Sequence, residues 1–175
     1  MKQIQKLPLT VLFFCLLNSA SHAQEKKEIS IKISFNAAEL AFQHQLFNAK
    51  TWGEAFIGVA NQDINNQFDD LLGGIRMGHT ILAKGRNQID LQVGTGIYKS
   101  NNDYYKAIAP FAEAGVRYVR HLGQTGRHNL LVSSGLRIGQ RDYKQNYRSE
   151  WFEAKTTGTL KLAPLIFSVG YAFKF

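Results

Sequence analysis

The chain ends with Ser168-Val-Gly-Tyr-Ala-Phe-Lys-Phe175, a stretch in which every second residue is apolar or aromatic. Small or polar residues occupy the positions between them. Alternation with a period of two predicts a β-strand with one apolar face. The pattern continues to Phe175, so we expect the final strand to include the last residue. The apolar set is Val169, Tyr171, Phe173 and Phe175.

The first 23 residues are expected to form a secretory signal peptide, and residues 24–175 the mature domain. Lys2 and Lys6 precede an apolar run, Leu7 to Leu17, that is too short to span a bilayer as a helix. Ser21-His22-Ala23 fits the small-x-small pattern of a cleavage site. A short N-terminal membrane anchor is the alternative interpretation.

The composition of the expected mature domain restricts its chemistry. Cys15, the single cysteine of the chain, lies in the expected signal. Without it, disulfide bonds, thiol catalysis and cysteine-based metal sites are excluded. The mature domain would carry 19 Lys and Arg residues against 13 Asp and Glu residues, a net charge of +6. The domain has no run of basic residues of the kind that binds nucleic acid. We therefore expect its positive charge to face anionic lipid headgroups.

Alternating segments recur along the mature domain. None of its apolar runs is long enough for a membrane-spanning helix, so a mature domain that crosses a membrane must be a closed barrel. Strands of such barrels read as alternations of about ten residues separated by turn formers. We therefore predict an all-β fold, a transmembrane antiparallel up-and-down β-barrel of eight strands. The predicted strands are 38–47, 51–60, 71–82, 88–98, 109–119, 129–139, 149–162 and 165–175.

The polar faces of these segments favour a membrane barrel over a soluble secreted β-barrel or sandwich, the alternative. A membrane barrel directs apolar side chains to lipid and polar ones to a narrow interior. Glycines gather on the polar faces, as a crowded interior requires, and the charges there have both signs. We expect these charges to pair in the lumen: Glu54, Arg76, Asp90, Glu113, Arg117, Arg137, Glu153 and Lys155.

The ending Gly170-Tyr-Ala-Phe-Lys-Phe175 resembles the C-terminal strand of Gram-negative outer-membrane β-barrel proteins. The resemblance implies location in the outer membrane, in contact with its lipid and lipopolysaccharide. It also implies that Tyr171, Phe173 and Phe175 form a signal for the barrel-assembly machinery. The final strand would close the barrel against the first.

Two features complicate the strand assignment. Segment 29–35 alternates with apolar residues at odd positions, whereas 38–47 has them at even positions. We expect 29–35 to extend the first strand through a bulge at 36–38, because a ninth strand would break the even count of bacterial barrels; a separate strand is the alternative.

The second feature concerns orientation. Counting strands back from Phe175 places the longer stretches 61–68, 100–107 and 140–147 in the periplasm. The rule that external loops are the longer ones gives the opposite result. The sequence leaves this conflict open.

A search for catalytic residues yields no constellation. A hydrolase requires a nucleophile and a base within hydrogen-bond reach, and Ser133 and Ser134 lie several residues from His128. Segment 61–70 lacks the glycine and glutamate of a calcium loop. We therefore expect no enzymatic activity, no cofactor and no metal site. The remaining mature histidines are His44, His79 and His121.

Two stretches combine tyrosines with charged residues and are possible surface contacts, although tyrosines also form the aromatic girdle of membrane proteins. An eight-stranded interior is just wide enough for side chains or one small ligand. The expected role is structural or surface-interacting. The alternatives are a narrow channel or small-ligand-binding barrel, and a lipid A-modifying enzyme. The possible contact residues are Tyr104, Tyr105, Arg141, Tyr143, Lys144 and Tyr147.

Overall fold

The computed structural model describes residues 27–46, 50–61, 70–100, 108–149 and 151–175. The expected signal peptide and the possible contact residues Tyr104 and Tyr105 lie outside these ranges. The side chains of 144–148, which include Lys144 and Tyr147, are likewise not described. Within the described ranges, no helix has the length and apolar character needed to cross a membrane.

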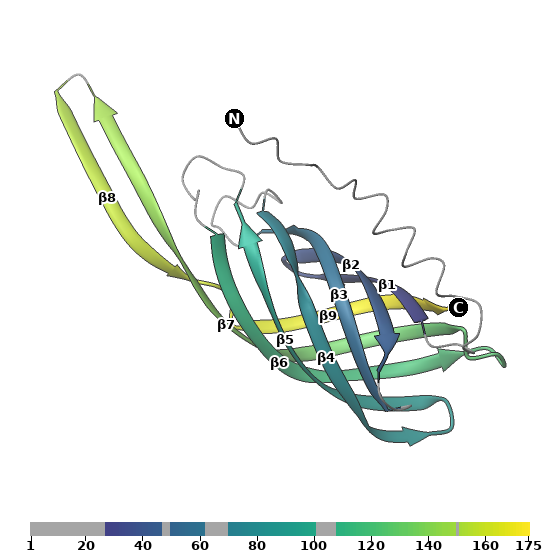
Figure 1. The fold of residues 1–175 in the computed structure, drawn as a ribbon. Coiled ribbons are helices and arrows are strands. Elements are labelled where there is room, and N and C mark those ends of the chain that lie inside the picture. Colours follow the sequence, from purple (N-terminus) through teal and green to yellow (C-terminus); the bar gives the residue numbers. More distant parts are fainter. Residues whose placement is uncertain (1–26, 47–49, 62–69, 101–107, 150) are drawn as a thin grey trace, which may run out of the picture.

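The described residues form β-strands that follow one another along the chain (Figure 1). Every pair of neighbouring strands is antiparallel. The strands are β1 (Lys27–Ser34), β2 (Ala37–Gln45), β3 (Thr51–Ala60), β4 (Asp70–Lys84), β5 (Asn87–Lys99), β6 (Ile108–Leu122), β7 (His128–Ser149), β8 (Phe152–Lys161) and β9 (Leu165–Lys174).

Eight of these strands close into a barrel, which confirms the predicted fold. Strands β1 to β7 pair in sequence order, and β9 completes the circle by pairing with both β7 and β1. Tyr171 lies opposite Ile31 on one side and Leu130 on the other. Closure leaves no free sheet edge around the wall.

Strand β1 corrects the prediction that 29–35 extends the next strand. It is a separate wall strand, and Ile33 lies opposite Ala38 across a tight hairpin turn. Ser34 Oγ holds this turn by donating to the carbonyl of Ala37 at 3.1 Å. Across a two-residue turn, residues of odd number face residues of even number. The change of parity therefore marked a hairpin and not a bulge.

Strand β8 corrects the prediction that 149–162 crosses the barrel wall. It pairs only with the second half of β7, from Gln140 opposite Lys161 to Ser149 opposite Phe152. The two form a hairpin that projects beyond the barrel (Figure 1). The count of eight is right, but β1 belongs to the wall and β8 does not.

The same correction removes the conflict over orientation. Strands β8 and β9 both run antiparallel to β7, so they form one return path and not two crossings. The short connections 46–50, 85–86 and 123–127 then lie at the end that carries Phe175. The long connections and the β7–β8 hairpin leave from the opposite end. Strand order and loop length now predict the same orientation.

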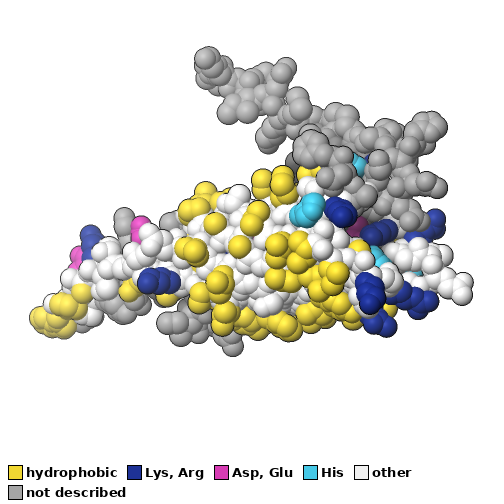
Figure 2. Space-filling model, turned by 90° about the horizontal axis from the view of Figure 1, so that it is seen from below, with side chains coloured by type: hydrophobic (Ala, Val, Ile, Leu, Met, Phe, Trp, Pro, Cys, Tyr) yellow, Lys and Arg dark blue, Asp and Glu magenta, His cyan; other side chains and the backbone are white. Residues whose placement is uncertain are grey.

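The polarity of the wall is that of a membrane barrel and not of a soluble sandwich. Ile31 and Ile75 on the outer face are 55% and 62% exposed, whereas Arg117 on the inner face is 1% exposed. Figure 2 shows apolar side chains spread over the outer surface between more polar ends. An apolar surface of this extent is unusual on a soluble monomer.

Candidate functional site: the charged barrel interior

Alternation places the same face of every strand inward, and the strand register then aligns charged side chains into a row. Going around the wall, Glu54 of β3 lies opposite Arg76 of β4, which lies opposite Gly94 of β5. Gly94 lies opposite Glu113 of β6, and Glu113 opposite Arg137 of β7. The row therefore alternates in sign, apart from the glycine.

Arg76 is the centre of this network. Its guanidinium contacts Glu54 at 2.8 Å and Glu39 of β2 at 2.7 Å, and its Nε donates to Glu113. A Cβ at Gly94 would lie 2.8 Å from Arg76 Cγ and 3.3 Å from Glu113 Cγ. Glycine at this position thus makes room for the pair to meet.

Two further cations extend the network in both directions around the wall. Lys32 of β1 donates to both carboxylate oxygens of Glu54, at 2.6 and 2.7 Å. Arg137 donates to Glu113 Oε2 from two nitrogens, at 2.6 and 3.1 Å. Lys32 and Glu39 were not among the predicted lumen residues, although both alternate with apolar residues that face outward.

A second cluster lies closer to the end of the barrel that carries Phe175 and the short connections, which we call the short-turn end. Arg117 donates to Asp90 at 2.7 and 3.0 Å and to the side chain of Gln43 at 2.6 Å. Asp90 also accepts from Thr80 at 2.8 Å and from Gln88 at 2.7 Å. These neutral donors satisfy lone pairs of the buried carboxylate that Arg117 does not reach.

A third pair lies near the base of the β7–β8 hairpin. Arg141 of β7 and Asp70 of β4 form a two-point ion pair, with N···O distances of 3.0 and 3.1 Å. Both side chains are buried. Arg141 was expected to be a surface contact, and this expectation is wrong because its inward position on β7 directs it across the lumen.

Aromatic rings cover the faces of three of the buried guanidinium groups. Arg76 lies 3.7 Å from the centroid of the Phe56 ring, and Arg117 lies 3.8 Å from that of Trp52. The Arg137 guanidinium lies 4.4 Å from the Phe111 ring. Carboxylates can then bind the edges of each guanidinium while the ring attracts its face.

The buried charges nearly balance. Burying ions is tolerated when they are paired and hydrogen-bonded. The contacts above provide this pairing for all of the buried charges except Glu28, which accepts a hydrogen bond from Asn129 Nδ2 at 2.8 Å. A cavity of about 20 Å³ lies among Lys32, Glu39, Arg76, Glu113 and Arg137, which is room for about one water molecule. The buried set is Lys32, Arg76, Arg117, Arg137, Arg141, Glu28, Glu39, Glu54, Asp70, Asp90 and Glu113.

The structure brings together six of the eight residues that we expected to pair in the lumen. The other two, Glu153 and Lys155, are exposed on β8, outside the wall. Their position follows from the hairpin: β8 alternates like a wall strand, but it borders no lumen. Tyr143 is half-buried on the same hairpin.

The expected assembly signal lies at the seam where the barrel closes. Phe173 lies opposite Ile29 of β1 and His128 of β7, and the Phe175 amide donates to the Lys27 carbonyl at 3.0 Å. Tyr171 contacts His128 through its hydroxyl group. These positions are compatible with a structural role in closure, and recognition by the assembly machinery remains a prediction.

The described histidines lie towards the short-turn end. His79 Nδ1 lies 3.0 Å from Thr51 Oγ1, and His121 Nδ1 lies 2.6 Å from Asn129 Oδ1. Neither of these hydrogen bonds links a histidine to a serine or to a carboxylate, as a catalytic triad would require. Within the described ranges, no group of three His, Cys, Asp or Glu side chains is arranged to hold a metal ion.

The chain matches known proteins by structure and not by sequence. No protein-family model matches the chain, and no curated protein sequence matches it. A major outer membrane protein from Thermus thermophilus aligns with 87% of this chain and 100% of its own, with a TM-score of 0.54 and 10% identity. Outer membrane protein AlkL aligns with 89% of this chain and 93% of its own, with a TM-score of 0.46 and 10% identity. By its strand order, its closure and the first of these likenesses, the chain has the fold of the small outer-membrane β-barrel proteins.

Proposed function

We propose that this chain is a small outer-membrane β-barrel protein with a non-enzymatic role, which combines a closed, structural barrel with a surface-exposed interaction hairpin. It would be exported by its signal peptide and inserted with the short turns in the periplasm. The observation that carries the proposal is the network of ion pairs that fills the interior between β1, β3, β4, β6 and β7.

The filled interior supports a structural role over transport. Arg76 alone contacts carboxylates from three other strands and crosses much of the lumen. The cavity beside it has room for about one water molecule and is too small for a larger solute. Paired charges of nearly equal number also leave little net potential to attract an ion of either sign.

The β7–β8 hairpin supports an interaction role. Two strands without a third are marginally stable in water, yet this hairpin extends over ten paired positions beyond the wall. Its tip carries Trp151, 93% exposed, and Phe152, 64% exposed. Exposed aromatic residues at the end of a projecting ribbon are suited to contact another surface, and lipopolysaccharide is the partner we propose.

Outer-membrane location is tested by expressing the full precursor in a Gram-negative host and isolating the membranes. The protein is run on a denaturing gel with and without boiling. A closed barrel resists detergent, so the unboiled sample should migrate differently. Recovery from the soluble fraction, or identical migration, would contradict membrane location.

The role of the hairpin is tested by replacing residues 142–159 with an Asn-Gly turn, which joins Arg141 to its strand partner Leu160 and keeps the buried ion pair of Arg141 with Asp70. The shortened barrel should keep the heat-dependent shift but lose binding to immobilised lipopolysaccharide. Retained binding would show that the hairpin is not the contact. Loss of the shift would show that it belongs to the folded core.

A further inference from the structure

We propose that the outer wall carries a binding site for one anionic phospholipid, formed by an apolar groove over β2–β5 and by polar residues at its foot. The inference rests on the membrane location proposed above. It concerns the leaflet at the short-turn end, and it is independent of the hairpin and of the filled lumen.

The groove is a hollow of about 660 Å³ in the outward face. Its floor consists of Gly53 and Ala55 on β3, two small residues between neighbours with larger side chains. Phe42 of β2 and Ile75 and Met77 of β4 line its sides. A hollow with apolar walls and small residues at its base can hold an acyl chain in closer contact than a uniform apolar surface.

The foot of the groove is polar. Leu46, which lines the groove, donates its amide to the Thr51 carbonyl at 2.8 Å, and Thr51 lies opposite His79. Lys50 is adjacent, because its carbonyl accepts from the Thr80 amide at 2.8 Å. The Thr51 hydroxyl and the His79 imidazole therefore meet where the apolar lining ends, with the Lys50 backbone beside them.

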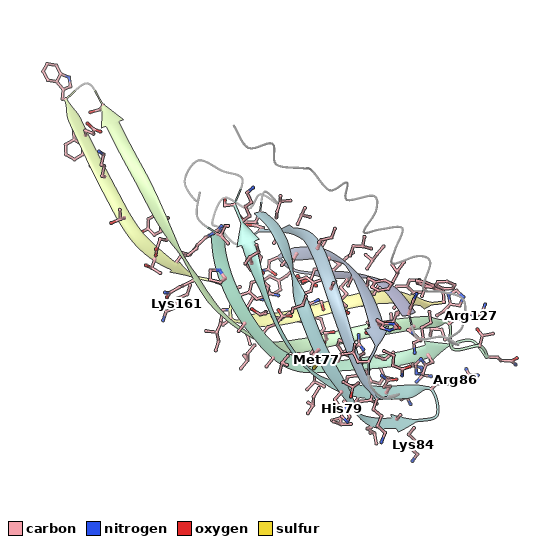
Figure 3. All side chains as sticks on the ribbon, in the orientation of Figure 1. Met77, His79, Lys84, Arg86, Arg127 and Lys161 are labelled. Carbon is pink, nitrogen blue, oxygen red and sulfur yellow. The ribbon has the colours of Figure 1, made fainter. Side chains whose placement is uncertain are left out.

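These groups suit a phosphate. Thr51 Oγ1 and His79 Nδ1 are 3.0 Å apart. If the Thr51 hydroxyl donates to Nδ1, a neutral His79 ring carries its proton on Nε2, where it can be donated to a phosphate oxygen. Lys50, which precedes Thr51 and is exposed, adds a positive charge at this end of the barrel. Figure 3 shows Met77, His79 and Lys84 in succession along β4, from the apolar wall to the charged turn.

Charge complementarity favours an anionic lipid over a zwitterionic one. Exposed Lys and Arg side chains gather at the short-turn end (Figure 2). The described Asp and Glu side chains lie elsewhere, either buried in the lumen or on the β7–β8 hairpin. Basic residues beside a membrane surface attract anionic lipids. The exposed cations at this end are Lys50, Lys84, Arg86, Arg120 and Arg127.

The site is tested on the purified, folded full-length barrel in detergent, by native mass spectrometry with added phosphatidylglycerol or phosphatidylcholine. The unmodified protein should retain one phosphatidylglycerol in preference to phosphatidylcholine. Replacing both Lys50→Gln and His79→Gln should lower phosphatidylglycerol retention by about fivefold or more. Ala55→Phe, which fills the groove, should lower retention of both lipids.

Two matched controls separate the site from general effects. Lys161→Gln removes an exposed cation at the base of the hairpin (Figure 3), and Ser134→Phe adds a large side chain to the outward face of β7; neither should change retention. Equal retention of the two lipids by the unmodified protein would overturn the proposal, whatever the variants do. Preferential retention of lipopolysaccharide over phosphatidylglycerol, or equal losses in the controls, would also overturn it. If the protein is not a membrane barrel, the denaturing gel will show this separately, because boiled and unboiled samples will migrate alike.

Discussion

Arg141 and Asp70 join β7 to β4 across the lumen through a two-point ion pair, although 71 positions separate them in the chain. The two strands are not neighbours in the wall. The pair lies where β7 leaves the barrel to form the hairpin with β8. It therefore anchors the base of the projecting hairpin to the opposite side of the wall.

We expect Asp70→Asn to destabilise this end of the barrel by roughly 3 kcal/mol, because it removes the carboxylate that pairs with the buried Arg141 guanidinium. The measurement is the urea midpoint of unfolding in detergent. Asp142→Asn is the matched control, since Asp142 is exposed and accepts a hydrogen bond from Thr159 at 2.9 Å. Equal midpoints for the two variants would show that the ion pair does not anchor the hairpin.

Arg117→Ala should lower the free energy of unfolding by about 3–5 kcal/mol, because it leaves Asp90 buried without its charged partner and uncovers the Trp52 ring. The urea midpoint of unfolding measures this change. The double variant with Asp90→Asn should recover part of the loss. Arg120→Ala, which removes an exposed arginine three positions away, should have little effect. An unchanged midpoint for Arg117→Ala would contradict the role of the ion pairs in holding the barrel together.

The barrel should not conduct ions in a planar bilayer, because Arg76 and its three carboxylate partners occupy the lumen. Replacing Arg76 and Glu113 together with alanine removes one charge of each sign and should produce a measurable conductance. Discrete conductance steps in the unmodified protein would contradict the closed lumen. They would favour the narrow channel instead.

Deletion of Phe175 should reduce the amount of protein in the outer membrane. The predicted assembly signal and the observed hydrogen bond to Lys27 give two different reasons for this effect. Refolding in detergent, without the assembly machinery, distinguishes them. Normal refolding of the deletion variant would favour a recognition signal, and slower refolding would favour a role in closure. Unchanged insertion in cells would exclude both roles. Lys174→Gln is a control next to the deleted residue.

The orientation can be tested with single cysteines, since Cys15 is the only natural one and lies in the expected signal peptide. Ser149 is exposed at the end of β7, and Gln124 is exposed in the turn between β6 and β7. A membrane-impermeant thiol reagent added to intact cells should label the Ser149→Cys variant and not the Gln124→Cys variant. The reverse labelling pattern would show that the short turns face outward.

Much of the lumen was predictable, because alternation assigns each residue of a strand to one face. Glu54, Arg76 and Glu113 were recognised in this way, and Lys32 and Glu39 carry the same signal. Which charges meet was not predictable. Arg76 and Glu113 lie on β4 and β6, and the curvature of the closed wall brings their side chains together.

The hairpin shows the limit of the local pattern most clearly. Residues 152–161 alternate, but their sequence, Phe-Glu-Ala-Lys-Thr-Thr-Gly-Thr-Leu-Lys, is poor in the large aliphatic residues that cover the other strands. That shortage of large aliphatic residues could have indicated that this strand does not face lipid. Alternation alone did not reveal that this strand pairs only with β7.

The sequence by itself determined the all-β class, the inverted polarity and the expectation of a terminal strand, because these depend on a period of two and on residue type at each position. Only the tertiary structure decided which segments form the wall, which end carries the long connections, and which charges pair. These depend on hydrogen bonding between distant strands, and Phe173 contacts β1 only because the whole circle closes. A periodic pattern describes the faces of a strand, but its neighbours are selected by closure and register.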